Sequence, residues 1–160
     1  MLVINQTLGA PPASSPERIG SVTQLDNVEF YVMSGNFAVE SLIVPMVPEG
    51  KHILAMNGRI IMSSMAIGAN GAHMLFGGVS PDLCMEIITA CMDDRFDEAR
   101  VYHERLAIAE GPMMRSMAGI KYGHDIMGYE AGPPRGPGNS LRDAEKDEIR
   151  KGFRLAGLIE

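Results

Sequence analysis

The stretch Ile53–Gly71, ILAMNGRIIMSSMAIGANG, decides the fold because the hydrophobic pattern changes twice within it. It begins inside a short apolar run, His52 to Met56, which we predict to be a strand, and an Asn-Gly pair ends that run with turn residues. The apolar segment from Ile60 to Ile67 predicts a helix, closed by a glycine. The next run, Ala72 to Phe76, predicts another strand. Strand, helix and strand in this order indicate a parallel pair joined by a crossover helix.

The same alternation precedes this stretch. Leu2 to Ile4 and Val28 to Met33 are two more apolar runs that predict strands. Ser15, followed by a proline, predicts the start of a helix that runs to about Leu25, and a shorter helix is expected from Ala38 to Val44. Short strands without polar alternation are typical of sheets buried on both faces. The pattern therefore predicts an α/β fold with a parallel sheet of four strand–helix units.

The rest of the chain has a helical pattern. Four helices are expected, the first beginning at Ser80-Pro81 and the others at about Phe96–Ala109, Met114–Met127 and Arg142–Leu155. We expect two regions packed as one domain, residues 1–79 with the strands and residues 80–160 as a helical tail.

Composition excludes several classes of protein. The formal net charge of −6 and the dispersed basic residues give no electrostatic footprint for nucleic acid or for anionic lipid. No apolar run reaches the ~18 residues of a membrane span, and the beginning of the chain does not resemble a signal peptide. Cys84 and Cys91 lie seven residues apart on one helix face, too distant to bond easily, and we expect buried free thiols rather than a disulfide or redox pair. A cytoplasmic location follows from these expectations.

Several short motifs, each weak alone, occur along the chain in the order that a known family shows. The stretch Ile53–Gly71 resembles the seventh and eighth strands of the dihydrodipicolinate synthase and N-acetylneuraminate lyase family. Upstream segments resemble its fifth and sixth strands, and downstream segments resemble its C-terminal tail: Val3-Ile-Asn5, Asn27–Phe37, Phe96–Ala99, Gly119-Ile-Lys121, Met127-Gly128, Pro134–Pro137 and Ala156–Leu158. The resemblance implies a partial (β/α)8 TIM-type barrel, the C-terminal half of a class I aldolase.

In that family a lysine on the sixth strand forms a Schiff base with a 2-keto acid, usually pyruvate, and a tyrosine on the fifth strand relays protons. The lysine position falls on Val32 here, or on Tyr31 or Met33 if the alignment shifts by one residue, and the tyrosine position falls on Ile4. The resemblance therefore implies a lyase-family protein with no catalytic residue of its own, inactive alone. The alternative is a non-catalytic assembly or regulatory partner of a full-length aldolase barrel.

Four residues at strand ends are candidates for binding a small ligand. Asn5, Ser34 and Asn57 have side chains that form hydrogen bonds with a carboxylate, or that cap the turn which follows. His73 is predicted to point into the barrel cavity as an acid–base group, with a hydrogen-bonded buried histidine as the alternative. The four histidines show no spacing typical of a metal site, so we expect no metal and no cofactor.

Half a barrel leaves two unpaired sheet edges. We therefore expect a homo-oligomer or a complementary half-barrel chain to cover them, and we do not expect a stable monomer.

Overall fold

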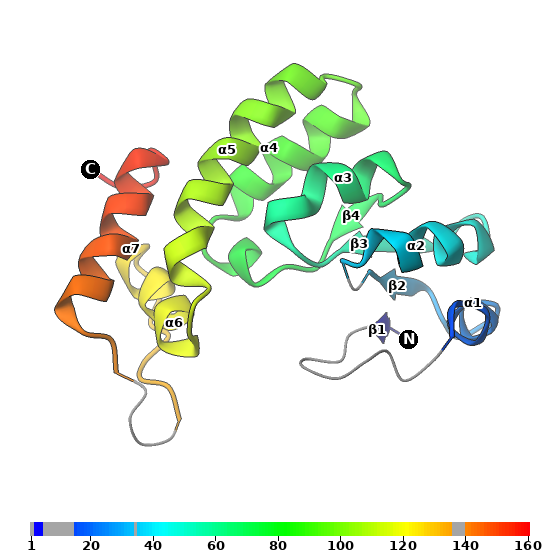
Figure 1. The fold of residues 1–160 in the computed structure, drawn as a ribbon, viewed down its shortest axis with the longest axis horizontal. Coiled ribbons are helices and arrows are strands. Elements are labelled where there is room, and N and C mark those ends of the chain that lie inside the picture. The colour runs from blue at the N-terminus through cyan, green and yellow to red at the C-terminus, as the bar shows by residue number, and fades with distance from the viewer. Residues whose placement is uncertain (1, 5–14, 34, 136–139) are drawn as a thin grey trace.

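A computed structural model describes residues 2–4, 15–33, 35–135 and 140–160 of the chain. Four strands alternate with helices in the first half, and four helices make up the second half (Figure 1). The strands and α-helices are, in chain order, β1 (Leu2–Ile4), α1 (Pro16–Thr23), β2 (Phe30–Val32), α2 (Phe37–Ile43), β3 (His52–Ala55), α3 (Ile61–Ala66), β4 (Gly71–Ala72), α4 (Pro81–Met92), α5 (Phe96–Met113), α6 (Met117–Ile126) and α7 (Asp143–Leu155). Three short 3₁₀ helices occur at η1 (Val44–Met46), η2 (Gly58–Ile60) and η3 (Leu75–Gly78).

The sheet has the order β1-β2-β3-β4, and every pair of neighbours is parallel. In the register, Phe30 is opposite His52, and Leu54 is opposite both Val32 and Gly71. Consecutive strands that are parallel neighbours require a crossover between them, which α1, α2 and α3 supply. The predicted α/β fold with four parallel strand–helix units is confirmed.

The hydrophobic core lies between one face of the sheet and the helices. Strands contribute Tyr31, Met33, Ile53 and Ala55 to it. Helices α1 to α4 each contribute at least one buried isoleucine, namely Ile19, Ile43, Ile61 and Ile87. Because alternate residues of a strand point to opposite faces, the residues between these strand positions lie on the other face of the sheet.

The last predicted strand is much shorter than expected. We predicted a strand from Ala72 to Phe76, but β4 ends at Ala72 and the chain turns into η3. The backbone N–H of Gly77 donates to the carbonyl of Met74 (3.1 Å), and that bond replaces a strand ladder. Phe76 is still fully buried, so the apolar run predicted the burial correctly and the local conformation incorrectly.

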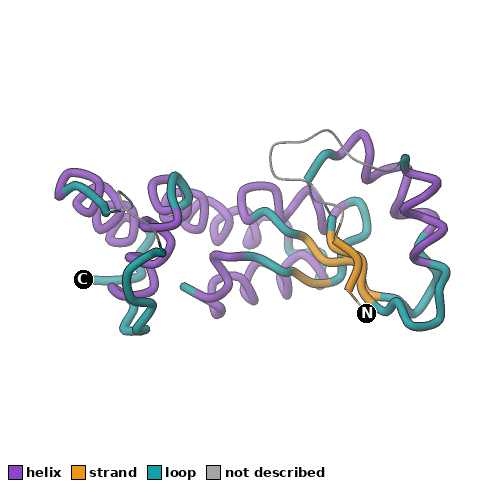
Figure 2. Tube along the Cα trace, turned by 90° about the horizontal axis from the view of Figure 1, so that it is seen from below, coloured by secondary structure: helices purple, strands orange, loops and turns teal. Residues whose placement is uncertain are grey.

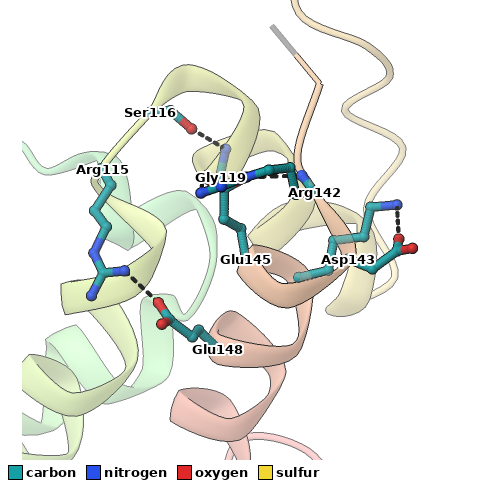
Figure 3. Close-up of polar contacts among 8 residues, drawn as sticks. Arg115, Ser116, Gly119, Arg142, Asp143, Glu145 and Glu148 are labelled. Atoms are coloured by element: carbon teal, nitrogen blue, oxygen red, sulfur yellow. Dashed lines mark hydrogen bonds and ion pairs between the residues drawn. The ribbon is translucent and has the colours of Figure 1, made fainter.

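The boundaries in the helical tail also differ from the prediction. Helix α5 continues past Ala109 to Met113, with Pro112 inside its last turn. Helix α6 begins at Met117 because the side chain of Ser116 accepts a hydrogen bond from the N–H of Gly119 (3.0 Å) and caps it (Figure 3). The pattern predicted two separate helices here, but it placed the break at residues 110–113 instead of 114–116.

Ion pairs tie the tail together on its outer surface. Arg115, which lies between α5 and α6, pairs with Glu148 of α7 (Figure 3). Arg142 and Glu145 pair at the beginning of α7, with the Arg142 Nε atom 3.1 Å from Glu145 Oε2. These groups are exposed, so each pair contributes about 0–1 kcal/mol, and the tail depends mainly on helix packing.

The tail extends away from the sheet. Helices α6 and α7 lie at the end of the molecule remote from β1, as both views show (Figures 1 and 2). Helix α4 packs against α3 and α5, and α5 packs against α7. The close approach of α7 to α5 occurs at Gly152, where a β-carbon would lie 2.9 Å from the carbonyl oxygen of Ile108.

Replacing Gly119 by alanine should test the packing of α6 on the end of α5. A β-carbon at this position would overlap the main-chain carbonyl oxygen of Met113, which cannot move aside without shifting the helix. We expect G119A to lower the free energy of unfolding by about 1–3 kcal/mol. Gly111 in α5 has open space around it, so G111A should raise stability by about 0.5–1 kcal/mol. Denaturant unfolding measures both, and equal effects would contradict the packing described here.

Candidate functional site

The face of the sheet that points away from the helices carries a set of apolar side chains. Phe30 stacks on His52, with ring centroids 5.2 Å apart. Leu54 lies beside Gly71, where a β-carbon would be 2.9 Å from Leu54 Cδ2. Val32 is opposite Leu54 in the register and is not part of the core cluster between sheet and helices. We call this surface, defined by Phe30, Val32, His52, Leu54 and Gly71, the inner face.

Asn57 follows β3 and caps the next turn. Its Oδ1 atom accepts a hydrogen bond from the backbone N–H of Arg59 (3.0 Å), which begins η2. Of the two roles that the sequence left open for Asn57, the cap is therefore present in the structure. Ligand binding by the amide nitrogen of Asn57 stays a prediction.

His73 follows β4 directly, and its backbone N–H donates to the carbonyl of Ala55 (2.7 Å). The residue is exposed, so its imidazole is not packed between the sheet and the helices. The two flanking residues, Ala72 and Met74, pack against the core. The inward orientation and the acid–base role of His73 stay predictions. Asn5 and Ser34 lie outside the described residues.

The positions that the family resemblance aligned with a lysine are all fully buried. Tyr31 and Met33 face the helices, and Val32 is on the inner face. The Tyr31 hydroxyl donates to Glu40 Oε2 of α2 (2.5 Å), which places a polar pair in the core. Sequence reasoning missed this pair. Its signal is a glutamate within the otherwise largely apolar segment Phe37–Ile43.

None of the four lysines lies at the carboxyl ends of the strands. Lys51 precedes β3 and donates from Nζ to the carbonyls of Thr23 and Leu25 (2.6 and 2.8 Å), which close the end of α1. Lys121 of α6 donates to the carbonyl of Ala131 (2.8 Å). Lys146 and Lys151 are in α7 at the far end of the tail, and Lys146 lies 3.3 Å from Asp143.

A buried carboxyl group connects the tail to the loop after β3. Glu110 of α5 is 3% exposed, and a β-carbon on Gly58 would lie 2.7 Å from its Oε1 atom. Its Oε2 atom has no hydrogen-bond partner, and the nearest cation atom is Arg59 Nε at 3.7 Å. Burial raises the pKa of Glu110, while Arg59 and the backbone N–H groups of Gly58 and Arg59 oppose that shift.

Two more contacts hold the same loop. His103 Nε2 lies 2.9 Å from the carbonyl oxygen of Arg59, and Arg59 Nη2 donates to the carbonyl of Gly111 (3.3 Å). Helix α5 therefore fixes η2, and with it the position of Asn57, through three of its residues. Sequence analysis did not single out Glu110, because its place in a helix with other charged residues is typical of an exposed glutamate.

The cysteines have the environment that the sequence predicted. Cys84 and Cys91 of α4 are both buried and free. Burial, followed by the negative charge of Glu110, raises the pKa of the Cys84 thiol to about 12. A thiol with that pKa carries almost no thiolate at neutral pH, so it is a poor nucleophile.

A cleft of about 370 Å³ lies between α4 and α5 rather than at the strand ends. Three of its polar side chains, Arg95, Glu98 and Tyr102, already take part in ion pairs or hydrogen bonds. Arg95 forms ion pairs with Asp93 and Glu98, and the Tyr102 hydroxyl donates to Glu98 Oε1 (2.9 Å). Within the described ranges, no group of three or more His, Cys, Asp or Glu residues could hold a metal ion. No described helix combines the length and the apolar character of a membrane span.

Comparison with known proteins bears on the fold. No family model matches the chain. A curated relative, 4-hydroxy-tetrahydrodipicolinate synthase of Methanopyrus kandleri, is 23% identical over 132 residues, which are 79% of this chain and 43% of that protein. Dihydrodipicolinate synthase from Cyanidioschyzon merolae with lysine bound has a TM-score of 0.88 at 16% identity, over 99% of this chain and 55% of that one.

N-acetylneuraminate lyase from Fusobacterium nucleatum has a TM-score of 0.79 at 15% identity, over 97% of this chain and 54% of that one. The chain thus spans about half the length of the proteins that it matches. It resembles dihydrodipicolinate synthase and N-acetylneuraminate lyase, as the sequence predicted, and its sheet has the fold of a partial TIM-type barrel.

Alanine substitutions should separate the structural role of Asn57 from that of His73. N57A removes a cap and should lower the free energy of unfolding by about 1 kcal/mol. H73A removes an exposed side chain and should change it by less than about 0.5 kcal/mol. Urea unfolding monitored by circular dichroism gives both values. A loss in H73A as large as that in N57A would show that the imidazole has a structural contact.

The buried carboxyl of Glu110 should make stability depend on pH. Its pKa is raised in the folded state, so the folded chain holds this proton more tightly than the unfolded chain does. The contribution of Glu110 to the free energy of unfolding therefore falls as the pH rises above the ordinary carboxyl pKa of about 4.3, and it stays low above the raised value.

We expect E110Q to remove this fall, measured as the difference in unfolding free energy between wild type and variant at pH 5 and pH 7. The difference isolates Glu110 from exposed carboxyls such as Glu98, whose pKa is lowered by Arg95 and which act in the opposite direction. Glu104, exposed on the same helix, supplies the control E104Q. An identical pH dependence in all three proteins would contradict the raised pKa.

Proposed function

We propose that this chain is a non-catalytic relative of the 2-keto acid aldolases, half of a barrel that is inactive alone. The observation that carries the proposal is the absence of an amine where such chemistry requires one. A Schiff base forms only with a neutral amine near the carboxyl ends of the strands. The sixth-strand position is occupied by Val32 or by its neighbours Tyr31 and Met33, and all four lysines lie elsewhere.

The remaining strand-end groups would bind rather than react. Asn57 and His73 follow neighbouring strands, and together with Asn5 and Ser34 they would bind the carboxylate of a pyruvate-type 2-keto acid. No described group beside them has the properties of a nucleophile or of a Schiff-base amine. We propose a ligand-binding or structural role in the cytoplasm, where the two free thiols stay reduced.

A second candidate function is favoured by the outer surface of the tail. This protein would then bind a full-length aldolase barrel and change its assembly or regulation. Met85 and Met92 of α4 are 55% and 63% exposed, and Val101 of α5 is 56% exposed. Exposed methionine is frequent at adaptable binding surfaces. In this proposal the half barrel and the tail, residues 1–79 and 80–160, act as one unit.

Borohydride trapping tests the absence of Schiff-base chemistry. The chain is incubated with pyruvate and sodium borohydride, and its mass is measured. We expect no adduct, because none of the four lysines lies at the carboxyl ends of the strands, where Schiff-base chemistry on this fold requires a neutral amine.

The control is L54K, which places an amine on β3 at the inner face and shows whether a lysine there becomes reactive. A stoichiometric adduct on the wild-type chain would overturn the proposal, and peptide mapping would identify the lysine that reacts.

A further inference from the structure

We infer that Glu110 is a pH-dependent latch for the loop after β3: its neutral carboxyl group holds η2 against α5, and its carboxylate releases η2. Because η2 begins next to Asn57, the latch sets the position of a residue at the carboxyl end of a strand. The inference rests on the proposed function only in its consequence for a ligand, which Asn57 is proposed to bind.

The loop fits closely against the carboxyl group. Glu110 is buried, and a β-carbon on Gly58 would lie 2.7 Å from its Oε1 atom and 2.7 Å from Leu106 Cδ2. A glycine is therefore the residue that fits between α5 and η2 without displacing one of these groups. While η2 keeps this position it covers the carboxyl group, and Glu110 gains contact with water only when the loop moves away.

Glu110 and the cap formed by Asn57 depend on one N–H group. The backbone N–H of Arg59 donates to Asn57 Oδ1 (3.0 Å). The same N–H group, together with that of Gly58, favours the charged form of Glu110. A movement of η2 away from α5 therefore also moves the donor that fixes the Asn57 side chain.

The structure compensates the charge of an ionised Glu110 only in part. Its Oε2 atom is buried and has no hydrogen-bond partner among the described residues. Arg59 Nε lies 3.7 Å from that atom, too far for a hydrogen bond, and the Arg59 side chain is 53% exposed, so water screens its charge. A carboxylate therefore costs more free energy to bury here than a carboxylic acid does.

The direction of the effect follows from these two environments. In the released loop Glu110 is hydrated and has the ordinary carboxyl pKa, whereas burial raises its pKa in the latched loop. The latched state therefore holds the proton more tightly. Its stability relative to the released state is complete below the ordinary pKa of about 4.3, and it falls as the pH rises through the raised value.

Cys84 and His103 are the other titratable groups that the described residues place at this contact. Burial, and then the charge of Glu110, raises the pKa of the Cys84 thiol to about 12, so this group of α4 stays neutral at and below neutral pH. His103 of α5 has its Nε2 atom 2.9 Å from the carbonyl oxygen of Arg59. Helix α3, which also packs near α5, contains no titratable side chain. His103 is therefore the group that requires a control.

Hydrogen exchange, followed by NMR on the whole chain, measures the opening of the latch. Protection factors are compared at pH 5 and pH 7 for the amide of Gly58 and for that of Ile88, which is buried within α4 and reports global unfolding. We call the fall in protection at Gly58 beyond that at Ile88 the excess loss. In wild type we expect an excess loss of at least about threefold at pH 7, because local opening adds to global opening.

Four variants separate a latch from a fixed structural contact, with folding checked by circular dichroism. E110Q keeps a neutral group of similar shape at both pH values, so the excess loss should disappear. R59Q removes an exposed cation that favours the carboxylate, so the excess loss should grow, whereas a purely structural role of Arg59 would lower protection equally at both pH values. H103Q, without a titratable ring, and E104Q, exposed on the same helix, should both behave as wild type.

An equal loss of protection at Gly58 and Ile88 in wild type would overturn the inference. An excess loss that persists in E110Q, or one that H103Q removes, would overturn it as well.

Titration with pyruvate, followed through the side-chain amide signal of Asn57, measures the consequence for a ligand separately. A latched loop holds this amide in one place, so wild type should bind more tightly at pH 5 than at pH 7, and the difference should be smaller in E110Q. If pyruvate leaves the signal unchanged in both proteins, the proposed ligand binding by Asn57 fails, while the exchange measurements still decide whether Glu110 is a latch.

Discussion

The hydrogen-bond ladder of the parallel sheet is the constraint on which the rest of the structure depends. Each strand must have a neighbour on both sides, or an edge that water can satisfy. The crossover helices place β1 to β4 side by side in chain order, so the two ends of the order are also the two ends of the sheet. The helices can bury only one of its faces. The character of the opposite face, which carries Phe30, Val32 and Leu54, then determines what the chain can bind.

The helical tail does more than cover the sheet, because it also contacts a loop at the carboxyl end of a strand. Helix α5 reaches the loop after β3 with a buried carboxyl, a histidine and a backbone carbonyl, so a change in the tail acts directly on the carboxyl end of a strand. Burial destabilises the charged form of Glu110. Arg59 and the backbone N–H groups of Gly58 and Arg59 compensate that cost in part. An apolar residue would be easier to bury there, which suggests that the position of the loop matters more than the stability of the helix.

Periodicity predicted the architecture well and the boundaries less well. The alternation of apolar runs identified the four described strands and the parallel fold, because each of these strands is a short apolar segment without polar alternation. It failed at Phe76, where burial is retained but hydrogen bonds to Met74 and Phe76 turn the chain into η3. It also placed the break between α5 and α6 a few residues too early, because the cap at Ser116 that begins α6 leaves no mark in the apolar pattern. The Tyr31–Glu40 and Glu110–Gly58 contacts join residues that no local pattern relates, so they emerge only from the packing.

The residues in and next to β2 explain why the fold is compatible with the proposed absence of Schiff-base chemistry. Tyr31 and Met33 face the helices, and between them only Val32 lies on the inner face. A lysine at that one position would place an amine inside the barrel at a desolvation cost, which function justifies in an active enzyme. Valine has no such cost, lies opposite Leu54 in the strand register and favours the strand conformation. In the proposed non-catalytic role, a branched apolar side chain at this position therefore favours the strand and avoids the desolvation cost that a buried amine would carry.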